Sequence, residues 1–197
     1  PLSDVGAFIV HPPLGKWLIA LGMAVGGPDN TVGWRIATAL LGTATVLLVY
    51  LVARRLTGSL VVATVAGTLL AIDGLSIVMS RIALLDGILT FFVLLGVLFV
   101  IIDRQRTIPV LERRDPDKPD PFWGPVLWRR PWLIAAGTAL GAASAVKWSG
   151  LYVLAGFGLY VVVTDALARR RAGVVLWPTA AAFRQGPVSF VLLVFPA

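Results

Sequence analysis

Residues 36–53 read IATALLGTATVLLVYLVA, a stretch of 18 residues without a charged side chain. A helix needs about 20 apolar residues, with a range of roughly 17 to 25, to cross the hydrocarbon of a bilayer. Runs of similar character follow, and flanking turns and long basic side chains can supply the missing rise. The sequence therefore predicts an all-α, polytopic transmembrane helical bundle. Its spans are expected at about 36–53, 56–73, 87–102, 131–146 and 148–165, with a sixth at 186–197 that is still apolar where the sequence ends.

The composition excludes a soluble domain, because 58% of the residues are hydrophobic and only 14% are charged. We expect one membrane unit over residues 1–197, as a fragment of a longer chain. The sequence contains no cysteine and one histidine. It therefore offers no disulfide frame and no thiolate or histidine-rich metal centre, and we expect neither a metal nor a cofactor.

Basic residues are distributed unevenly around the spans, and positively charged loops stay on the cytoplasmic side during insertion. All but four of the 17 basic residues fall into groups that alternate spans would place on one face. These groups are Arg54 with Arg55, the basic residues of loop 103–130, and residues 169–171 with Arg184. We expect this face to be cytoplasmic, with loop 103–130 as a solvated connector and with Asp103 and Asp165 at helix ends.

The net charge of +7 is explained by this topology and by contact with anionic lipid of the inner leaflet. The sequence contains no nucleic-acid recognition module. We therefore expect membrane lipid, and not nucleic acid, as a partner of the chain.

Four basic residues remain for the outer face: Lys16, Arg35, Arg81 and Lys147. Ionisable groups at the membrane boundary are costly unless they are paired, hydrated or used. Each could be an interfacial side chain with a local ion pair, and Asp86 is placed to pair with Arg81. Four cations at one depth also suit a lipid-linked phosphate, because arginine offers a bidentate fork and lysine a point charge.

Three motifs in this order resemble those of one enzyme family: HPPLGK at 11–16, SRIALLD at 80–86 and KWSGLY at 147–152. The chain is similar to the protein O-mannosyltransferases, polytopic glycosyltransferases of the GT-C class, in a bacterial form. The resemblance implies a multi-pass plasma-membrane enzyme. Such an enzyme transfers mannose from a polyprenyl (dolichyl-type) phosphate to Ser or Thr of secreted proteins, on the extracytoplasmic face and with inversion.

The resemblance also assigns roles to residues. Arg35 aligns with an arginine that is important in the family and is the first candidate for contact with the donor phosphate, followed by Lys147 and Arg81. Asp86 is expected to orient Arg81. The double proline of HPPLGK is expected either to make a rigid entry into the bilayer or to hold His11 and Lys16 over the sugar-phosphate pocket. The family's catalytic acidic pair is expected upstream of Pro1, so no catalytic residue is assigned within the chain.

Three other functional classes stay open from the sequence. A secondary transporter also holds charges in a helical bundle, but its site lies near the bilayer midplane, whereas these charges lie at span ends. A catalytically incomplete membrane scaffold fits a chain without the acidic pair. Another GT-C enzyme with a lipid-phosphate sugar donor, such as an arabinosyltransferase, is the nearest alternative, and the second and third motifs argue against it.

Overall fold

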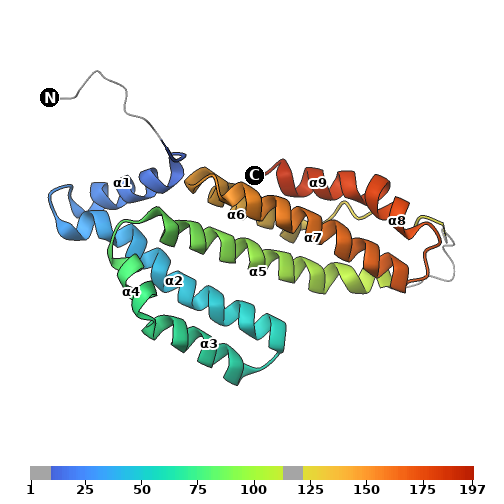
Figure 1. The fold of residues 1–197 in the computed structure, drawn as a ribbon, viewed down its shortest axis with the longest axis horizontal. Helices are drawn as coiled ribbons and strands as arrows, with labels where there is room; N and C mark the ends of the chain where they lie inside the picture. The colour runs from blue at the N-terminus through green and yellow to red at the C-terminus, as the bar shows by residue number, and fades with distance from the viewer. Residues whose placement is uncertain (1–9, 113–121) are drawn as a thin grey trace, which may run out of the picture.

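The computed structural model describes residues 10–112 and 122–197, and these residues form helices and connecting turns without strands (Figure 1). The all-α prediction is therefore confirmed for this part of the chain. In chain order the helices are α1 (Leu14–Gly26), α2 (Thr31–Thr57), α3 (Leu60–Ile72), α4 (Gly74–Arg81), α5 (Leu85–Glu112), α6 (Pro131–Val146), α7 (Gly150–Arg171), α8 (Trp177–Thr179), the π-helical turn η1 (Ala180–Gln185) and α9 (Gly186–Val194).

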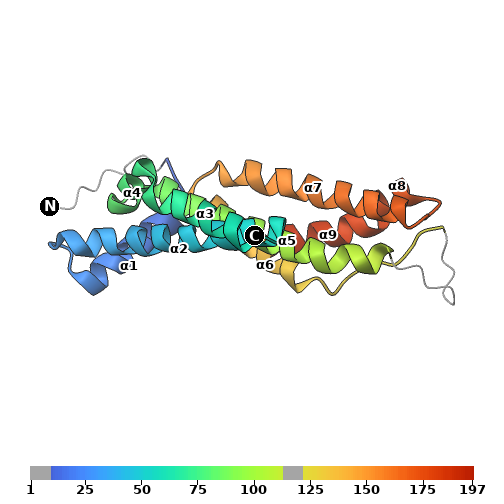
Figure 2. The same cartoon turned by 90° about the horizontal axis from the view of Figure 1, so that it is seen from below.

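Helix α5 is the central element of an elongated bundle (Figures 1 and 2). It contacts α2 on one side, and α6 and α7 on the other. The larger apolar core lies between α5, α6, α7 and α9; its buried residues are Val100, Leu133, Ala136, Leu140, Leu154, Val161 and Leu193. A smaller core joins α2 to α5 through Leu48, Leu98 and Ile102.

Polar side chains at the turns determine where the first helices begin. The side chain of Asn30 accepts a hydrogen bond from the amide of Val32 at the start of α2 (3.0 Å). Ser59 caps α3 in the same way, and Asp73 caps α4 by accepting from the amide of Ser76 (2.7 Å). Such caps satisfy amides that have no partner within the helix.

Glycines allow α1 to pack closely on the first turns of α2. A methyl group on Gly22 would lie 2.7 Å from the carbonyl oxygen of Gly33, and one on Gly26 would lie 2.6 Å from its Cα. Small residues spaced four apart permit such close helix packing in membrane proteins. This contact holds α1 beside the end of α2 that carries Arg35.

Three helices of the described chain, α2, α5 and α7, are long and apolar enough to cross a membrane. Helices α3 and α4 are bent by 59° and make a fourth crossing if they form one span. Many large apolar side chains of these helices are exposed, as expected for surfaces that face lipid or further membrane helices. The chain is thus a polytopic helical membrane domain. The total of six spans stays a prediction, because α6 is apolar but shorter and α9, at the predicted sixth span, has nine residues.

Candidate functional site

The residues expected on the outer face lie at one end of the bundle. Helix α1, the start of α2, α4, the start of α5 and the junction of α6 and α7 meet at this end (Figure 1). The ends of α2, α5 and α7 that carry the basic groups lie away from it. The separation of charges inferred from the sequence therefore corresponds to two ends of the folded chain.

The clearest contact at this end joins Lys147 to Asp86. The Nζ of Lys147 lies 2.7 Å from Oδ1 of Asp86, and the two side chains are 30% and 47% exposed. Lys147 occupies this place because α6 ends at Val146 and the lysine backbone is extended (φ −153°, ψ 139°). Among the described residues the ammonium group therefore has one partner, and it remains open to a further anion.

The partner of Asp86 differs from the one that the sequence suggested. The sequence predicted that Asp86 pairs with Arg81, five residues before it. Helix α4 ends at Arg81, where Ile82 adopts an extended backbone (φ −113°, ψ 144°), and α5 begins at Leu85. Among the described residues, Asp86 makes its ion pair with Lys147 and not with Arg81.

The HPPLGK segment is attached to the same place. The indole N–H of Trp148 donates to the carbonyl of Val10 (3.2 Å), and the ammonium of Lys16 donates to the carbonyl of His11 (3.4 Å). A methyl group on Gly15 would lie 2.6 Å from the side chain of Leu85 and 3.1 Å from that of Val146. These contacts bring His11 and Lys16 beside the Lys147–Asp86 pair.

One imidazole nitrogen at this site has no protein partner. The Nδ1 atom of His11 is buried and has no hydrogen-bond partner among the described residues. A buried polar atom without a partner is costly. A ligand hydroxyl or phosphate oxygen that reached this nitrogen would remove the cost.

Arg35 and Arg81 lie at the same end, but no contact joins them to the other candidates. The guanidinium of Arg35 lies over the ring of Trp34, 4.4 Å from its centroid. Within residues 10–112 and 122–197 neither arginine makes an ion pair. Both side chains are exposed and therefore available to an anion. Arg81 also lines a cavity of about 650 Å³ between α2, α3 and α4.

A metal centre has no basis in the described residues, which contain no group of three histidine, cysteine or carboxylate side chains. The expectation that the protein needs no metal or cofactor stays a prediction.

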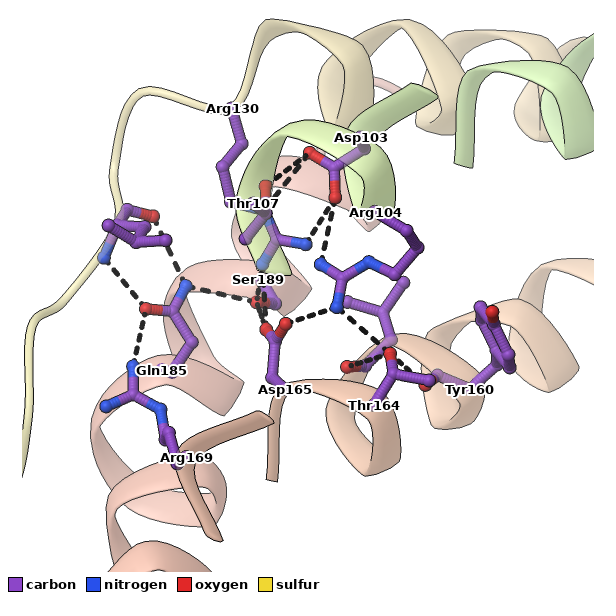
Figure 3. A network of polar contacts seen from close by, with 12 residues as sticks. Asp103, Arg104, Thr107, Arg130, Tyr160, Thr164, Asp165, Arg169, Gln185 and Ser189 are labelled. Atoms are coloured by element: carbon purple, nitrogen blue, oxygen red, sulfur yellow. Dashed lines mark hydrogen bonds and ion pairs between the residues drawn. The ribbon is translucent and has the colours of Figure 1, made fainter. Parts of the chain in front are cut away.

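A second polar group, which the sequence did not predict, is buried at the other end of the bundle (Figure 3). Asp103 on α5 accepts hydrogen bonds from Arg104 (2.9 Å) and Arg130 (2.5 Å). Asp165 on α7 accepts from Arg130 (2.8 Å) and also from Arg104. These four side chains are at most 5% exposed. Their two positive and two negative charges cancel, which is what burial of ions requires.

Asp103, Arg104, Arg130 and Asp165 are called the charge ring below. Further polar residues connect this ring to α9 and to the segment before α6. Ser189 accepts from Arg130 (3.0 Å). Gln185 exchanges two hydrogen bonds with the backbone of Leu127 (2.8 and 3.2 Å). Arg169, which is fully buried, donates to the carbonyls of Trp123 (2.8 Å) and Pro125 (2.5 Å). The ring therefore fixes the chain segment that leads into α6.

The ring corrects the expectation that loop 103–130 is a solvated connector with Asp103 and Asp165 at helix ends. Helix α5 continues to Glu112, and both aspartates are buried within the packed helices. Burial opposes the charged form of Arg130, but hydrogen bonds and charges from Asp103 and Asp165 outweigh it and raise the pKa of this guanidinium above its ordinary value. Residues 113–121 of the predicted loop lie outside the described residues.

Comparison with known proteins identifies the family of the chain. The family model described as dolichyl-phosphate-mannose-protein mannosyltransferase matches residues 24–183. The chain belongs to this family. The resemblance seen in the three motifs is thereby confirmed. Of the candidate residues, the matched range contains Arg35, Arg81, Asp86 and Lys147, and it begins after His11 and Lys16.

Several curated mannosyltransferases are similar to the chain. A polyprenol-phosphate-mannose–protein mannosyltransferase of Mycobacterium tuberculosis is 44% identical over 168 residues, which are 83% of this chain and 31% of the relative. One of Corynebacterium glutamicum is 42% identical over 84% of the chain and 32% of the relative. Dolichyl-phosphate-mannose–protein mannosyltransferase 1 of Candida albicans is 32% identical over 78% and 17%. The chain thus spans about a third of its bacterial relatives. No solved structure matches it.

Proposed function

We propose that the chain is part of an enzyme that transfers mannose from a polyprenyl (dolichyl-type) phosphate to Ser or Thr hydroxyls of secreted proteins. Membership of the mannosyltransferase family and the names of the bacterial relatives support this activity. The proposed location is the plasma membrane, with the Lys147 end of the bundle on the extracytoplasmic side. The basic groups at the opposite end support this orientation.

The observation that carries the proposal is the gathering of cations at the Lys147 end. The Lys147–Asp86 pair, Lys16 and the unpartnered nitrogen of His11 lie together, and Arg35 and Arg81 lie at the same end. In the proposed reaction, the bond from the sugar C1 to the phosphate oxygen breaks while a bond to the acceptor oxygen forms. The phosphate leaves with the electron pair, and nearby cations stabilise this charge.

Each residue at this site has a proposed part. Arg35, Lys147 and Arg81 contact the leaving phosphate. Asp86 positions Lys147. The acceptor hydroxyl must lose its proton as it attacks, which is the task of a carboxylate base. The acidic pair expected upstream of Pro1 stays a prediction for that role.

Arg35→Ala and Lys147→Met in the full-length protein test the proposal. The assay is transfer of mannose from polyprenyl phosphate mannose to a Ser/Thr peptide in membranes. Loss of one group that stabilises transition-state charge lowers kcat by about 100-fold or more, so we expect a loss of that size in each variant. Arg54→Ala is the matched control, because it removes one exposed charge at the opposite end.

The two variants are expected to stay folded, because both side chains are at least partly exposed. Normal transfer by both variants would reject the phosphate site while leaving the activity itself in place. No transfer by the wild-type protein with this donor would reject the proposed function.

A further inference from the structure

A pocket at the end of the bundle opposite Lys147 has the features of a phosphate site. It has a volume of about 460 Å³ and lies between the last turns of α5 and the segment that leads into α6. Its lining includes Arg106, Arg129, Trp128 and Trp132, with Arg130 and Asp103 of the charge ring beside them. The volume falls within the range of roughly 300 to 1,000 Å³ that is usual for small-molecule sites.

Among the described residues, the charge at this pocket is positive and is not compensated by a carboxylate. Asp103 is occupied by the guanidinium groups of the ring. Arg106 and Arg129 are exposed, and among the described residues neither makes an ion pair. The guanidinium of Arg106 lies over the ring of Trp132, 5.1 Å from its centroid, which holds the charge at the pocket. The free positive charge therefore lies at the pocket rim, where an anion can reach it.

The first turn of α6 adds a second attraction for an anion. This helix begins at Pro131, and its N-cap residue, Arg130, provides no side-chain cap, because a guanidinium has no acceptor atom for the amides of the first turn. Pro131 has no N–H, and the amide of Leu133 donates to the carbonyl of Arg130 (3.0 Å). The first turn therefore offers a phosphate the amide of Trp132 and the helix dipole. The pocket thus combines this helix end with two arginines.

The surroundings favour a lipid over a soluble phosphate. Trp128 is 62% exposed beside the start of an apolar helix. Tryptophan is enriched at the level of lipid headgroups, which indicates that the pocket opens at that depth. Val110, Leu127 and Pro131 add apolar surface to the lining, which suits the glycerol and upper acyl region of a lipid.

We propose that this pocket binds the phosphate of an anionic membrane phospholipid. The side chains of Arg106 and Arg129 bind the phosphate, and the positive end of the α6 dipole attracts its negative charge. Trp128 packs against the glycerol region. The inference does not rest on mannosyl transfer, because the pocket lies at the first turn of α6 and Lys147 of the proposed donor site follows the last turn of the same helix.

Photoactivatable phosphatidylglycerol in nanodiscs with the full-length protein tests the proposal. We expect a crosslink on the 122–132 segment, identified by mass spectrometry of the peptides. Arg106→Gln with Arg129→Gln should lower its yield about tenfold at a subsaturating lipid fraction, because charge-assisted hydrogen bonds are lost. The control is Arg170→Gln with Arg171→Gln, which removes the same charge from exposed residues at the same end.

Two further arms identify the ligand. Arg106→Lys with Arg129→Lys keeps the charge and should retain most of the crosslink, which separates a charge effect from a folding defect. Photoactivatable phosphatidylcholine should label the segment much less than phosphatidylglycerol does. An equal yield from both lipids, an undiminished yield in the glutamine variant, or displacement by millimolar inorganic phosphate would each overturn the proposal.

Discussion

Asp165→Asn is the substitution that most directly tests the energetic role of the charge ring. The variant keeps the shape of the side chain but removes its charge. Asp165 is 1% exposed and accepts hydrogen bonds from both Arg104 and Arg130. In the variant, two guanidinium groups share the single negative charge of Asp103, and one face of the new amide presents N–H donors to an arginine.

The expected cost follows from this burial. Removing one partner of a buried ion pair destabilises a protein by about 3–5 kcal/mol, because it leaves an uncompensated buried charge. We expect a loss of this size for Asp165→Asn. Glu112→Gln is the matched control: Glu112 pairs with Arg171 at 3.6 Å with the side chains 37% and 70% exposed, and exposed pairs contribute about 1 kcal/mol or less.

Reversible unfolding in mixed detergent micelles, followed by circular dichroism, measures both variants. A double-mutant cycle with Arg104→Gln then isolates the coupling between the two residues. Equal stability of Asp165→Asn and Glu112→Gln would refute the reasoning, because it would mean that water or another group replaces the lost charge. A coupling near zero would show that Asp165 acts through Arg130 alone.

Two more predictions concern the opposite end and the orientation of the chain. Asp86→Asn should lower mannosyl transfer by the full-length protein about tenfold, because its lysine partner loses its anchor; Asp86→Glu should restore part of the rate, and thermal unfolding should change little because this pair is half-exposed. Unchanged transfer in Asp86→Asn would argue against a positioning role. The chain contains no cysteine, so single cysteines can report which side of the membrane a residue faces. Asp29→Cys should react with an impermeant maleimide in intact cells, and Arg171→Cys should react only after permeabilisation. The reverse pattern would invert the proposed topology.

The sequence was sufficient for the long apolar helices because uncharged runs of this length have few alternatives, but it gave no span for α4 and one span at 56–73, where α2 ends and α3 begins. Helix α6 covers the same residues as the predicted 131–146 segment, and its limits are visible as a proline at one end and a lysine at the other. It was not sufficient for α5, which continues well past the charges at Asp103 and Arg104. Charges end an apolar run, but they do not end a helix when neighbouring helices supply their counterions.

The candidate site was also predicted in part. The three motifs identified the residues that lie near Lys147, because each motif lies next to the end of an apolar helix. They did not give the partner of Asp86, because the choice depends on a backbone break at Ile82 and on a lysine 61 positions away. The charge ring left only a faint signal, namely charges of opposite sign at the ends of apolar runs.

The charge ring also has a consequence for how the chain is made. Asp103 and Arg104 are neighbours that pair with each other, so α5 can enter the membrane with its two charges already neutralised. Asp165 has no such neighbour in its ring, and both of its arginine partners are synthesised before it. Because a lone carboxylate is costly in the bilayer, α7 gains most from insertion after α5 and Arg130 are in place. Synthesis from the N-terminus supplies the partners in this order, and Ser189 arrives last to close the network.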